Sequence, residues 1–445
     1  MPASWAEMPG LAVLEENRRT NKGLVESQVL SLSYGKVIVK PVEKQRGLVP
    51  ESYEGYQVLD PGDIVVRPTD LQNDQTSIRV GHVRDRGIIT SAYIGVRPRG
   101  EWTDGYAFHY LAVVDSSKRI YGMGSGLRQQ LGWGDLKRMP CIVPPAEEQV
   151  AIVKYVSHAN ARIDKAIAAK RRLIALVSEC SAQTARQVLS GRAARNVELD
   201  SGDRVPWLGQ IPRAWEALPL KRLAKLRSGA GFPVDRQARS GEEIPFFRVS
   251  DMGLTGNEVF LANCDSTVSR DEASELGAVV FDADSIAFPK VGGALLTNKR
   301  RILGQASCLD NNLMGANFYG LERDYAFEIM KLVDLSDIAK PGPVPAVGQG
   351  DVGRIVVPVP SLQEQSDLVE ELRDSERELT STATVAMREI ALLHEFRTRL
   401  VADVVTGQVD VRAIAATLPD APTTIDEAVP ELDDALEEAL GESEE

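Results

Sequence analysis

Five short segments of the chain gather the polar side chains that recognise the edges of nucleic-acid bases. Arginine forms paired hydrogen bonds with guanine, and asparagine or glutamine forms them with adenine, because their donors and acceptors match those base edges. The segments are "RPTDLQNDQ", "SGLRQQ", "FFRVSD", "FPKVGG" and "TNKRR". The candidate DNA-binding residues in them are Arg67, Asp70, Gln72, Asn73, Gln75, Ser125, Arg128, Gln129, Arg248, Ser250, Asp251, Lys290, Asn298, Lys299 and Arg300. One such residue alone is more often an ordinary solvated loop residue, so the prediction rests on their clustering.

Aromatic side chains could add stacking to these contacts. Tyr34 and Tyr93 are candidates for packing on sugars or bases, although aromatic residues beside strands more often belong to the core. Residues that contact phosphates position a protein on DNA, and residues that contact base edges specify its sequence. The sequence does not separate the two kinds.

Motifs for catalysis are missing from the sequence. It has no glycine-rich phosphate loop that ends in Gly-Lys-Ser/Thr, and no Asn/Asp-Pro-Pro-aromatic run of the kind that holds a flipped adenine. Its four histidines and four cysteines lack the spacing of metal ligands or of a disulfide framework. We therefore expect no catalytic residue, metal site or cofactor in this chain.

The charge of the chain is unevenly distributed. The formal charge is −13, but residues 413–445 carry eleven acidic side chains and no basic ones, which leaves −2 on the other 412 residues. A body so close to neutral can still present local basic surfaces to phosphate. The sequence assigns no role to this acidic tail, and we expect it to be disordered.

Length and hydropathy restrict the class of protein. At 445 residues the chain exceeds the usual limit of about 250 to 300 residues for a single core, so we expect two or more domains. Its apolar runs are too short to span a membrane, and its first residues lack the pattern of an export signal. A cytoplasmic location is therefore expected.

The chain contains an internal repeat. The segment "DLKRMPCIVPPAEEQVAIV" (135–153) returns as "DVGRIVVPVPSLQEQSDLV" (351–369), 216 residues later. Without a gap, the same offset aligns the pair Ser190, Gly191 with Thr406, Gly407. A match of this length indicates two related halves.

Each copy of the repeat starts a long segment with almost no helix breaker. Both segments end at a glycine, Gly191 or Gly407, where a helix C-cap glycine belongs. In the first, a coiled-coil seam is predicted that is interrupted only by Lys170 and consists of Ile152, Val156, Ala159, Ile163, Ala166, Leu173, Val177 and Cys180. In the second, the predicted seam is Leu368, Leu372, Leu379, Ile390, Leu393, Phe396 and Leu400, with Ser375, Thr382 and Ala386 as its weak members.

The two segments are predicted to pair as antiparallel helices. Residues 147–195 carry a charge of +5 and residues 358–412 a charge of −5, which favours pairing between them. The alternative is that each helix covers only its own domain. A helix of some 43 residues would be roughly 65 Å long, more than a small domain needs. We expect a central helix at 147–195, a C-terminal helix at 358–412 and a pseudo-two-fold relation between the halves.

The remaining regions, residues 1–146 and 196–357, are predicted to be mixed α/β domains. Both contain short alternating apolar runs, which are typical of strands, separated by the turn-forming residues glycine, proline and asparagine. In the second region we also expect helices near 213–227 and 322–335. The two regions resemble each other much less than the two helices do, as expected of similar scaffolds that carry different binding loops.

Particular segments resemble the specificity subunits of type I restriction-modification enzymes. They are "VPWLGQIPRAWEALPLKRLAKLRSG" (205–229), "GDIVVRPTDLQNDQ" (62–75) and the two helix starts, and the likeness covers nearly the whole chain. The first residues depart from the pattern, since the usual tryptophan-led entry is reduced to "SWAEMPGLAVLEENRRTNKG". The acidic tail after Arg412 is also outside it.

The resemblance implies a non-catalytic subunit with two target-recognition domains, each reading half of a split DNA site. Its partners would be double-stranded DNA, modification (methyltransferase) subunits, two in number, and restriction (motor-nuclease) subunits. Those partners would use S-adenosylmethionine, ATP and Mg. The repeated pairs Glu148, Gln149 and Glu364, Gln365 at the helix starts are then candidate subunit-interface residues. The alternatives are a structural adaptor with two protein-binding ends, or a self-contained methyltransferase or nuclease, which the missing motifs disfavour.

Overall fold

The structure is a computed structural model that describes residues 2–33, 35–40, 52–69, 79–123, 130–192, 197–340, 342 and 344–420. These residues form two compact units. Among the described residues, the first contains those up to 170 and those from 387 to 420, and the second contains 171–386. The division falls inside two long helices, so each unit combines one globular region with parts of both helices.

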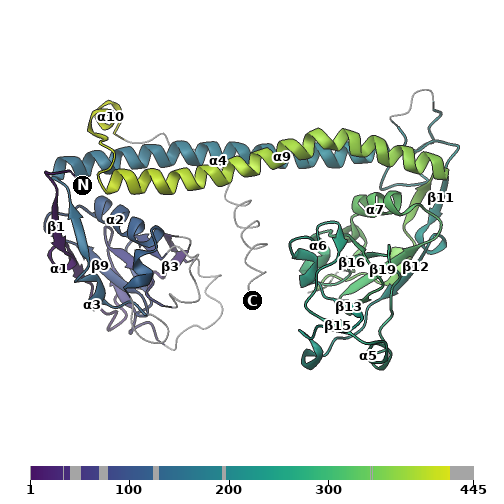
Figure 1. Cartoon of the computed structure of the whole chain (residues 1–445), viewed down its shortest axis with the longest axis horizontal. Coiled ribbons are helices and arrows are strands. Elements are labelled where there is room, and N and C mark those ends of the chain that lie inside the picture. Colours follow the sequence, from purple (N-terminus) through teal and green to yellow (C-terminus); the bar gives the residue numbers. More distant parts are fainter. Residues whose placement is uncertain are drawn as a thin grey trace. The chain divides into compact units, whose positions relative to one another are not determined.

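The globular region of the first unit is a mixed α/β fold dominated by strands (Figure 1). Its elements are β1 (Ala6–Pro9), α1 (Gly10–Val13), β2 (Leu14–Glu16), β3 (Leu30–Ser33), β4 (Lys36–Val39), β5 (Gln57–Leu59), β6 (Ile64–Val66), β7 (Val80–His82), β8 (Gly87–Ile89), β9 (Ile94–Pro98), α2 (Asp104–Ser116), η2 (Arg119–Gly122), α3 (Trp133–Leu136) and β10 (Pro140–Val143). Six strands form one sheet in the order β2-β9-β6-β7-β4-β3, while β1 pairs with β10 and β5 with β8.

Helix α2 covers this sheet and closes the core of the first unit. The helix starts at Thr103, whose side chain accepts a hydrogen bond from the backbone N–H of Tyr106. Its buried face, with Tyr106 and Tyr110, packs in the same cluster as Ile64 of β6 and Val96 of β9. Every residue of β6 is buried, which explains its unbroken run of β-branched side chains.

The globular region of the second unit has the same character (Figure 1). Its elements are β11 (Glu216–Pro219), η3 (Leu220–Arg222), β12 (Ala224–Ser228), η4 (Val234–Arg236), β13 (Ile244–Phe247), η5 (Ser250–Gly253), β14 (Phe260–Leu261), β15 (Thr267–Val268), α5 (Arg270–Glu275), β16 (Ile286–Pro289), α6 (Gly293–Leu296), β17 (Arg301–Leu303), β18 (Cys308–Leu309), β19 (Leu313–Phe318), α7 (Arg323–Leu332), η6 (Leu335–Ile338), α8 (Gln349–Gly353) and β20 (Val356–Val359). The sheets have the orders β12-β19-β16-β17-β14, β15-β13-β18 and β11-β20.

One helix predicted in the second region is absent and the other is present. Residues 213–227 form β11, η3 and β12 instead of a helix, because β11 finds a partner in β20 and β12 in β19. Pro219 at the end of β11 also lacks the N–H that a helix interior requires. The helix expected near 322–335 is α7, which starts where Glu322 accepts hydrogen bonds from the backbone of Asp324 and Tyr325.

The two long helices are α4 (Ala146–Leu189) and α9 (Leu362–Val405). They are antiparallel within each unit. In the first unit Asp164 pairs with Arg397 and Lys170 with Glu389, and in the second the Ser181 hydroxyl donates to Glu376 over 2.7 Å. Gly191 and Gly407 follow the helix ends with φ of 70° and 73°, so the predicted glycine caps are confirmed.

The predicted seam is confirmed for most of its members. On α4, Ile152, Val156 and Ile163 are buried, whereas Leu173 and Cys180 are exposed. On α9, Leu368, Leu372 and Ala386 are buried, and Phe396 is 55% exposed. A straight helix drifts by about 20° for each heptad, so single members of a seven-residue pattern leave the contact face. Lys170 does not interrupt the seam, since its ammonium group reaches Glu389.

The repeat in the sequence corresponds to repeated tertiary contacts. Trp5 donates its indole N–H to Glu148 over 2.8 Å, and Trp215 donates its own to Glu364 over 3.1 Å. β1 pairs with β10 as β11 pairs with β20. The tryptophan-led entry that looked reduced at the start of the chain is therefore complete, because Trp5 makes the contact that Trp215 makes in the second unit.

The first residues of the acidic tail are folded, in contrast to the expectation for residues from 413 onward. They belong to α10 (Arg412–Thr417), which lies beside α4 (Figure 1). Val411 and Ala415 are buried, Val411 in the same core as Trp5. The rest of the tail, residues 421–445, lies outside the described residues.

Candidate nucleic-acid interface

The described residues that flank the two predicted binding loops of the first unit lie close together. Asp70, Gln72, Asn73 and Gln75 of one loop, and Ser125, Arg128 and Gln129 of the other, lie outside the described residues, as does Tyr34. The residues that flank both loops are described. Leu131, after the second loop, donates its backbone N–H to the carbonyl of Pro68, before the first, over 3.1 Å. The fold therefore brings the bases of both loops together.

Arg79 fixes these loop bases, and sequence analysis did not identify it. Its side chain is fully buried, although it directly follows a polar loop. The guanidinium group donates to the carbonyl of Thr69 over 2.5 Å and to the hydroxyl of Tyr121 over 3.2 Å. Its backbone N–H donates to Asp115 of α2 over 2.6 Å. Burial raises the pKa of Asp115, against the opposing effect of Arg79. Arg79 thus ties the loop bases to α2.

Arg67 and Tyr93 stand beside these loop bases and are both half-buried. The backbone N–H of Arg67 donates to the carbonyl of Arg79 over 2.8 Å. Tyr93 packs against the buried cluster of Leu30 and Val65, and its carbonyl accepts from Gln57 over 2.8 Å. The ring of Tyr93 therefore contributes to the core, the alternative that its place beside a strand favoured.

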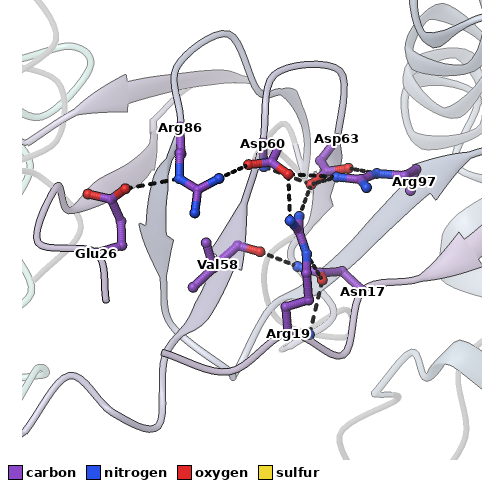
Figure 2. A network of polar contacts seen from close by, with 8 residues as sticks. All are labelled: Asn17, Arg19, Glu26, Val58, Asp60, Asp63, Arg86 and Arg97. Atoms are coloured by element: carbon purple, nitrogen blue, oxygen red, sulfur yellow. Dashed lines mark hydrogen bonds and ion pairs between the residues drawn. The ribbon is translucent and has the colours of Figure 1, made fainter. Parts of the chain in front are cut away.

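A network of alternating charges joins the turns of the first unit (Figure 2). The fully buried Asp63 accepts from Arg97 over 2.7 Å and from Arg19 over 3.1 Å. Asp60 accepts from Arg19 over 2.5 Å and from Arg86 over 2.8 Å, and Arg86 also donates to Glu26. Its three cations and three anions neutralise one another, so the network acts mainly to hold the turns in place.

Arginines from this network also line a cavity at the sheet edge. The cavity measures about 420 Å³ and lies between β2, β9 and α3. Its basic and aromatic lining residues are Arg18, Arg19, Arg97, Arg99 and Trp133. The side chain of Arg18 is 81% exposed and donates to Glu16 over 2.9 Å. None of these side chains was predicted as a binding residue. The segment "EENRRTNKG" has three basic and two acidic side chains and no glutamine.

In the second unit, Lys290 lies at the centre of a polar cluster. Its ammonium group donates to the hydroxyl of Ser228 over 3.0 Å, and Gln349 Nε2 contacts the same oxygen over 3.3 Å. The cluster collects the ends of β16 and β12 and the start of α8. Gly229, which follows Ser228, packs so closely on the chain after β18 that a Cβ there would lie 2.0 Å from the carbonyl oxygen of Asp310. Ser228 and Gln349 were not predicted, since nothing in the sequence places them near Lys290.

Arg248 and Asp251 are engaged within the second unit. Arg248 donates to both carboxylate oxygens of Asp265, over 2.9 and 3.0 Å, and its backbone N–H donates to Asp251 over 2.6 Å. The side chain of Asp251 is buried, and burial raises its pKa. The prediction of Asp251 as a DNA contact is corrected, because this carboxylate closes a turn in the interior. Ser250 beside it is exposed.

The segment "TNKRR" divides into exposed and buried residues. Arg300 is 2% exposed and donates to the carbonyls of Met330 and Val333 over 3.0 and 3.1 Å. Burial lowers its pKa to about 10. A DNA contact by Arg300 is therefore contradicted in this fold. The side chain of Asn298 is also engaged within the fold, because its oxygen accepts a hydrogen bond from Arg300 and its amide nitrogen donates to the carbonyl of Lys331. Lys299 between them is exposed.

The repeated Glu-Gln pairs form internal contacts rather than a surface for other subunits. Gln149 and Gln365 are almost wholly buried. Gln149 accepts from the backbone N–H of Thr103, the N-cap of α2, over 2.9 Å, and Gln365 accepts from that of Glu322, the N-cap of α7, over 2.7 Å. Each glutamine thus anchors a long helix to the helix that covers the sheet. Glu148 and Glu364 are occupied by the two tryptophans.

Two kinds of site are absent from the described part of the chain. No helix there is long and apolar enough to cross a membrane. No three or more histidine, cysteine, aspartate or glutamate side chains are grouped there so that they could hold a metal ion.

Solved structures that are similar to this chain come from type I restriction-modification systems. A chain of a type I R-M system, from a study of complex assembly and conformational transition, has a TM-score of 0.58 and 15% identity over 92% of this chain and 99% of that one. The HsdS subunit from Thermoanaerobacter tengcongensis has a TM-score of 0.40, 16% identity and coverages of 92% and 98%. The S subunit from M. genitalium has a TM-score of 0.34 and 13% identity, over 90% of this chain and 96% of that one. No protein-family model and no curated protein matches the sequence. The first likeness shows that the fold is shared.

Proposed function

We propose that this chain is the specificity subunit of a type I restriction-modification complex and reads a bipartite DNA site. The observation that carries the proposal is the duplicated scaffold. The same tryptophan, glutamate, glutamine and glycine contacts build both units, while the polar loops and clusters on them differ. Two equivalent supports with different binding residues are what a reader of two unlike half-sites requires. The shared fold of a type I R-M chain supports the same conclusion.

In the first unit, the DNA-reading surface would be the joined bases of the loops around Arg67 and Leu131, with Arg18 contributing a phosphate contact. In the second unit it would be Lys290 with Ser228 and Gln349, together with the exposed Lys299. Lysine and serine suit phosphate oxygens, whereas the glutamine amide can pair with an adenine edge.

Partner subunits would bind the long helices at apolar side chains that α4 and α9 leave exposed. Leu176 is 50% exposed and is followed one turn later by the exposed Cys180. At the repeat offset of 216, Leu392 and Phe396 are each 55% exposed. One apolar pair in each unit, at equivalent helix positions, fits two copies of the same partner. These pairs replace Glu148, Gln149, Glu364 and Gln365 as the proposed subunit interface.

The chemistry of such a complex would belong to the partners. Two modification subunits would use S-adenosylmethionine to methylate adenine, and restriction subunits would use ATP and Mg, in the cytoplasm where the DNA is. This chain would contribute recognition and scaffolding without a cofactor of its own.

The test is a genome-wide map of methylated adenine in cells that express this chain with its modification subunit or that express the modification subunit alone. We expect a split motif that appears only when both are present. If the complex assembles and no new motif appears, the chain does not specify a DNA site and the adaptor function is favoured.

A further inference from the structure

In the first unit, one side of α4 carries four basic residues between positions 154 and 165, which we call the basic face. Lys154, His158, Arg162 and Lys165 follow each other at intervals of four, four and three residues. At about 100° per residue, they lie within roughly 80° of arc on one side of the helix. Arg162 and Lys165 are exposed, and neither forms an ion pair with a described residue. Asp164, which precedes Lys165 on α4, is paired with Arg397.

The first two members of this basic face already hold the end of the described chain. His158 donates its Nε2–H to the carbonyl of Pro419 over 2.8 Å. Lys154 forms an ion pair with Asp420 over 3.1 Å. These contacts border a cavity of about 490 Å³, which is also lined by Val150 and Val153. The chain therefore leaves the described structure in contact with the face.

The sequence after Asp420 has the opposite charge to this face. Residues 421–445 contain ten acidic side chains and no basic one, beginning with Asp426 and Glu427. Arg162 is eight residues beyond Lys154, about 12 Å along the helix, and Lys165 is about 16 Å along it. The six residues from Asp420 to Asp426 can span up to about 20 Å when extended. The acidic side chains can therefore reach both cations.

We propose that residues 421–445 bind the basic face of α4, continuing the contacts of Pro419 and Asp420 to Arg162 and Lys165. Each exposed ion pair contributes little alone. A tethered partner, however, acts at an effective concentration in the millimolar range, so several such pairs can keep the face occupied at moderate salt. The consequence, which rests on the proposed DNA-binding function, is that the tail keeps phosphates off this face and lowers affinity for unrelated DNA.

The direct experiment places a photo-crosslinking amino acid at Arg162 in the full chain. We expect capture of peptides from 421–445 within the same chain, with the yield falling steeply between 0.05 and 1 M salt (roughly a 14 Å to a 3 Å screening length). The control position is Ala391, which is exposed on α9 and should give no such capture. Capture of a second copy, or of no tail peptide at low salt, would overturn the proposal.

The second experiment measures affinity for a random-sequence duplex at low salt. Neutralising five tail residues, with Asp426→Asn, Glu427→Gln, Glu431→Gln, Asp433→Asn and Asp434→Asn, should raise this affinity about tenfold. The gain should vanish when Arg162→Gln and Lys165→Gln are added, and it should persist with Arg388→Gln and Arg399→Gln on α9. A gain that is independent of Arg162 and Lys165 contradicts the proposed site.

These outcomes are separable from those of the proposed function. The crosslink requires neither DNA nor a partner subunit, so it tests the tail even if no methylated motif is found. A methylated motif without the crosslink would leave the specificity function intact and remove the tail from this face.

Discussion

The indole of Trp5 lies over Gly407, so close that a Cβ at this glycine would come within 2.8 Å of two ring carbons. Trp215 lies over Gly191 in the same way, at 2.4 and 2.8 Å. The second residue after each long helix thus has two constraints, a left-handed backbone and an aromatic ring where a side chain would be.

This relationship predicts that Gly407→Ala destabilises the first unit by about 2–4 kcal/mol, the sum of left-handed strain and displacement of Trp5. Gly23→Ala is the matched control, because Gly23 has a φ of 78° and nothing within 4 Å of its Cβ position. It should cost only about 1 kcal/mol. Hydrogen exchange across residues 1–170 would measure both effects, and equal losses would mean that the Trp5 contact contributes nothing.

The charge network of the first unit should depend on Asp63. Asp63→Ala removes one of the two carboxylates that Arg97 and Arg19 share, while both guanidinium groups stay partly exposed and keep Asp60, so we expect the unit to lose only about 1–2 kcal/mol. Asp85→Asn, at an exposed position in a neighbouring turn, should change stability by less than about 0.5 kcal/mol. Urea unfolding of the two variants would decide, and similar midpoints would contradict a structural role for the network.

The same network predicts acid sensitivity. Hydrogen bonding from Arg19, supported by Arg97 and Arg86, holds the pKa of Asp60 below its ordinary value. Since the folded pKa is lowered, the stabilisation is complete above the ordinary aspartate pKa of about 4 and is lost as the pH falls toward the folded value. Asp60→Asn should therefore weaken the fold at pH 7 and flatten the loss of stability between pH 5 and 3. A variant with the wild-type pH profile would exclude Asp60 as a source of this sensitivity.

Two neighbouring residues of the second unit should respond in opposite ways. Arg300→Met removes buried hydrogen bonds to Met330 and Val333, so it should lower thermal stability. Lys299→Ala should leave stability unchanged and reduce the salt dependence of DNA binding by about one phosphate contact. Thermal unfolding and a salt titration of DNA affinity would separate these roles. A loss of DNA contacts without loss of stability in the Arg300 variant would reverse our correction.

Lys290 should influence one half-site only. Lys290→Met keeps the length of the side chain but removes the ammonium group that contacts Ser228. In the methylation map we expect degenerate bases or reduced occupancy in one half of the split motif and an unchanged second half. Gln349→Glu provides a second probe of the same cluster, since it replaces an amide donor with an acceptor. Equal effects on both halves would place Lys290 outside sequence recognition.

Local patterns in the sequence determined the organisation of the chain. The sequence alone predicted the 216-residue repeat, the two long helices and their glycine caps. It could do so because helix propensity and glycine conformation depend on neighbouring residues. The mixed, strand-rich character of both globular regions followed for the same reason. The strand β12 was not predicted, because a strand forms only where it can pair with another strand. Its partner β19 lies about 90 residues later in the sequence.

The tertiary structure decided which polar residues remain exposed. Arg300 and Lys299 are adjacent and equally basic, yet one is buried against the end of α7 and the other is in solvent. Gln149 and Gln365 looked like surface residues on helices, but each reaches the N-cap of a helix more than 40 residues earlier. Side-chain burial and hydrogen bonding depend on contacts between segments that are distant in the sequence. Composition and spacing therefore predicted which loops bind, while only the fold shows which of their described residues are exposed.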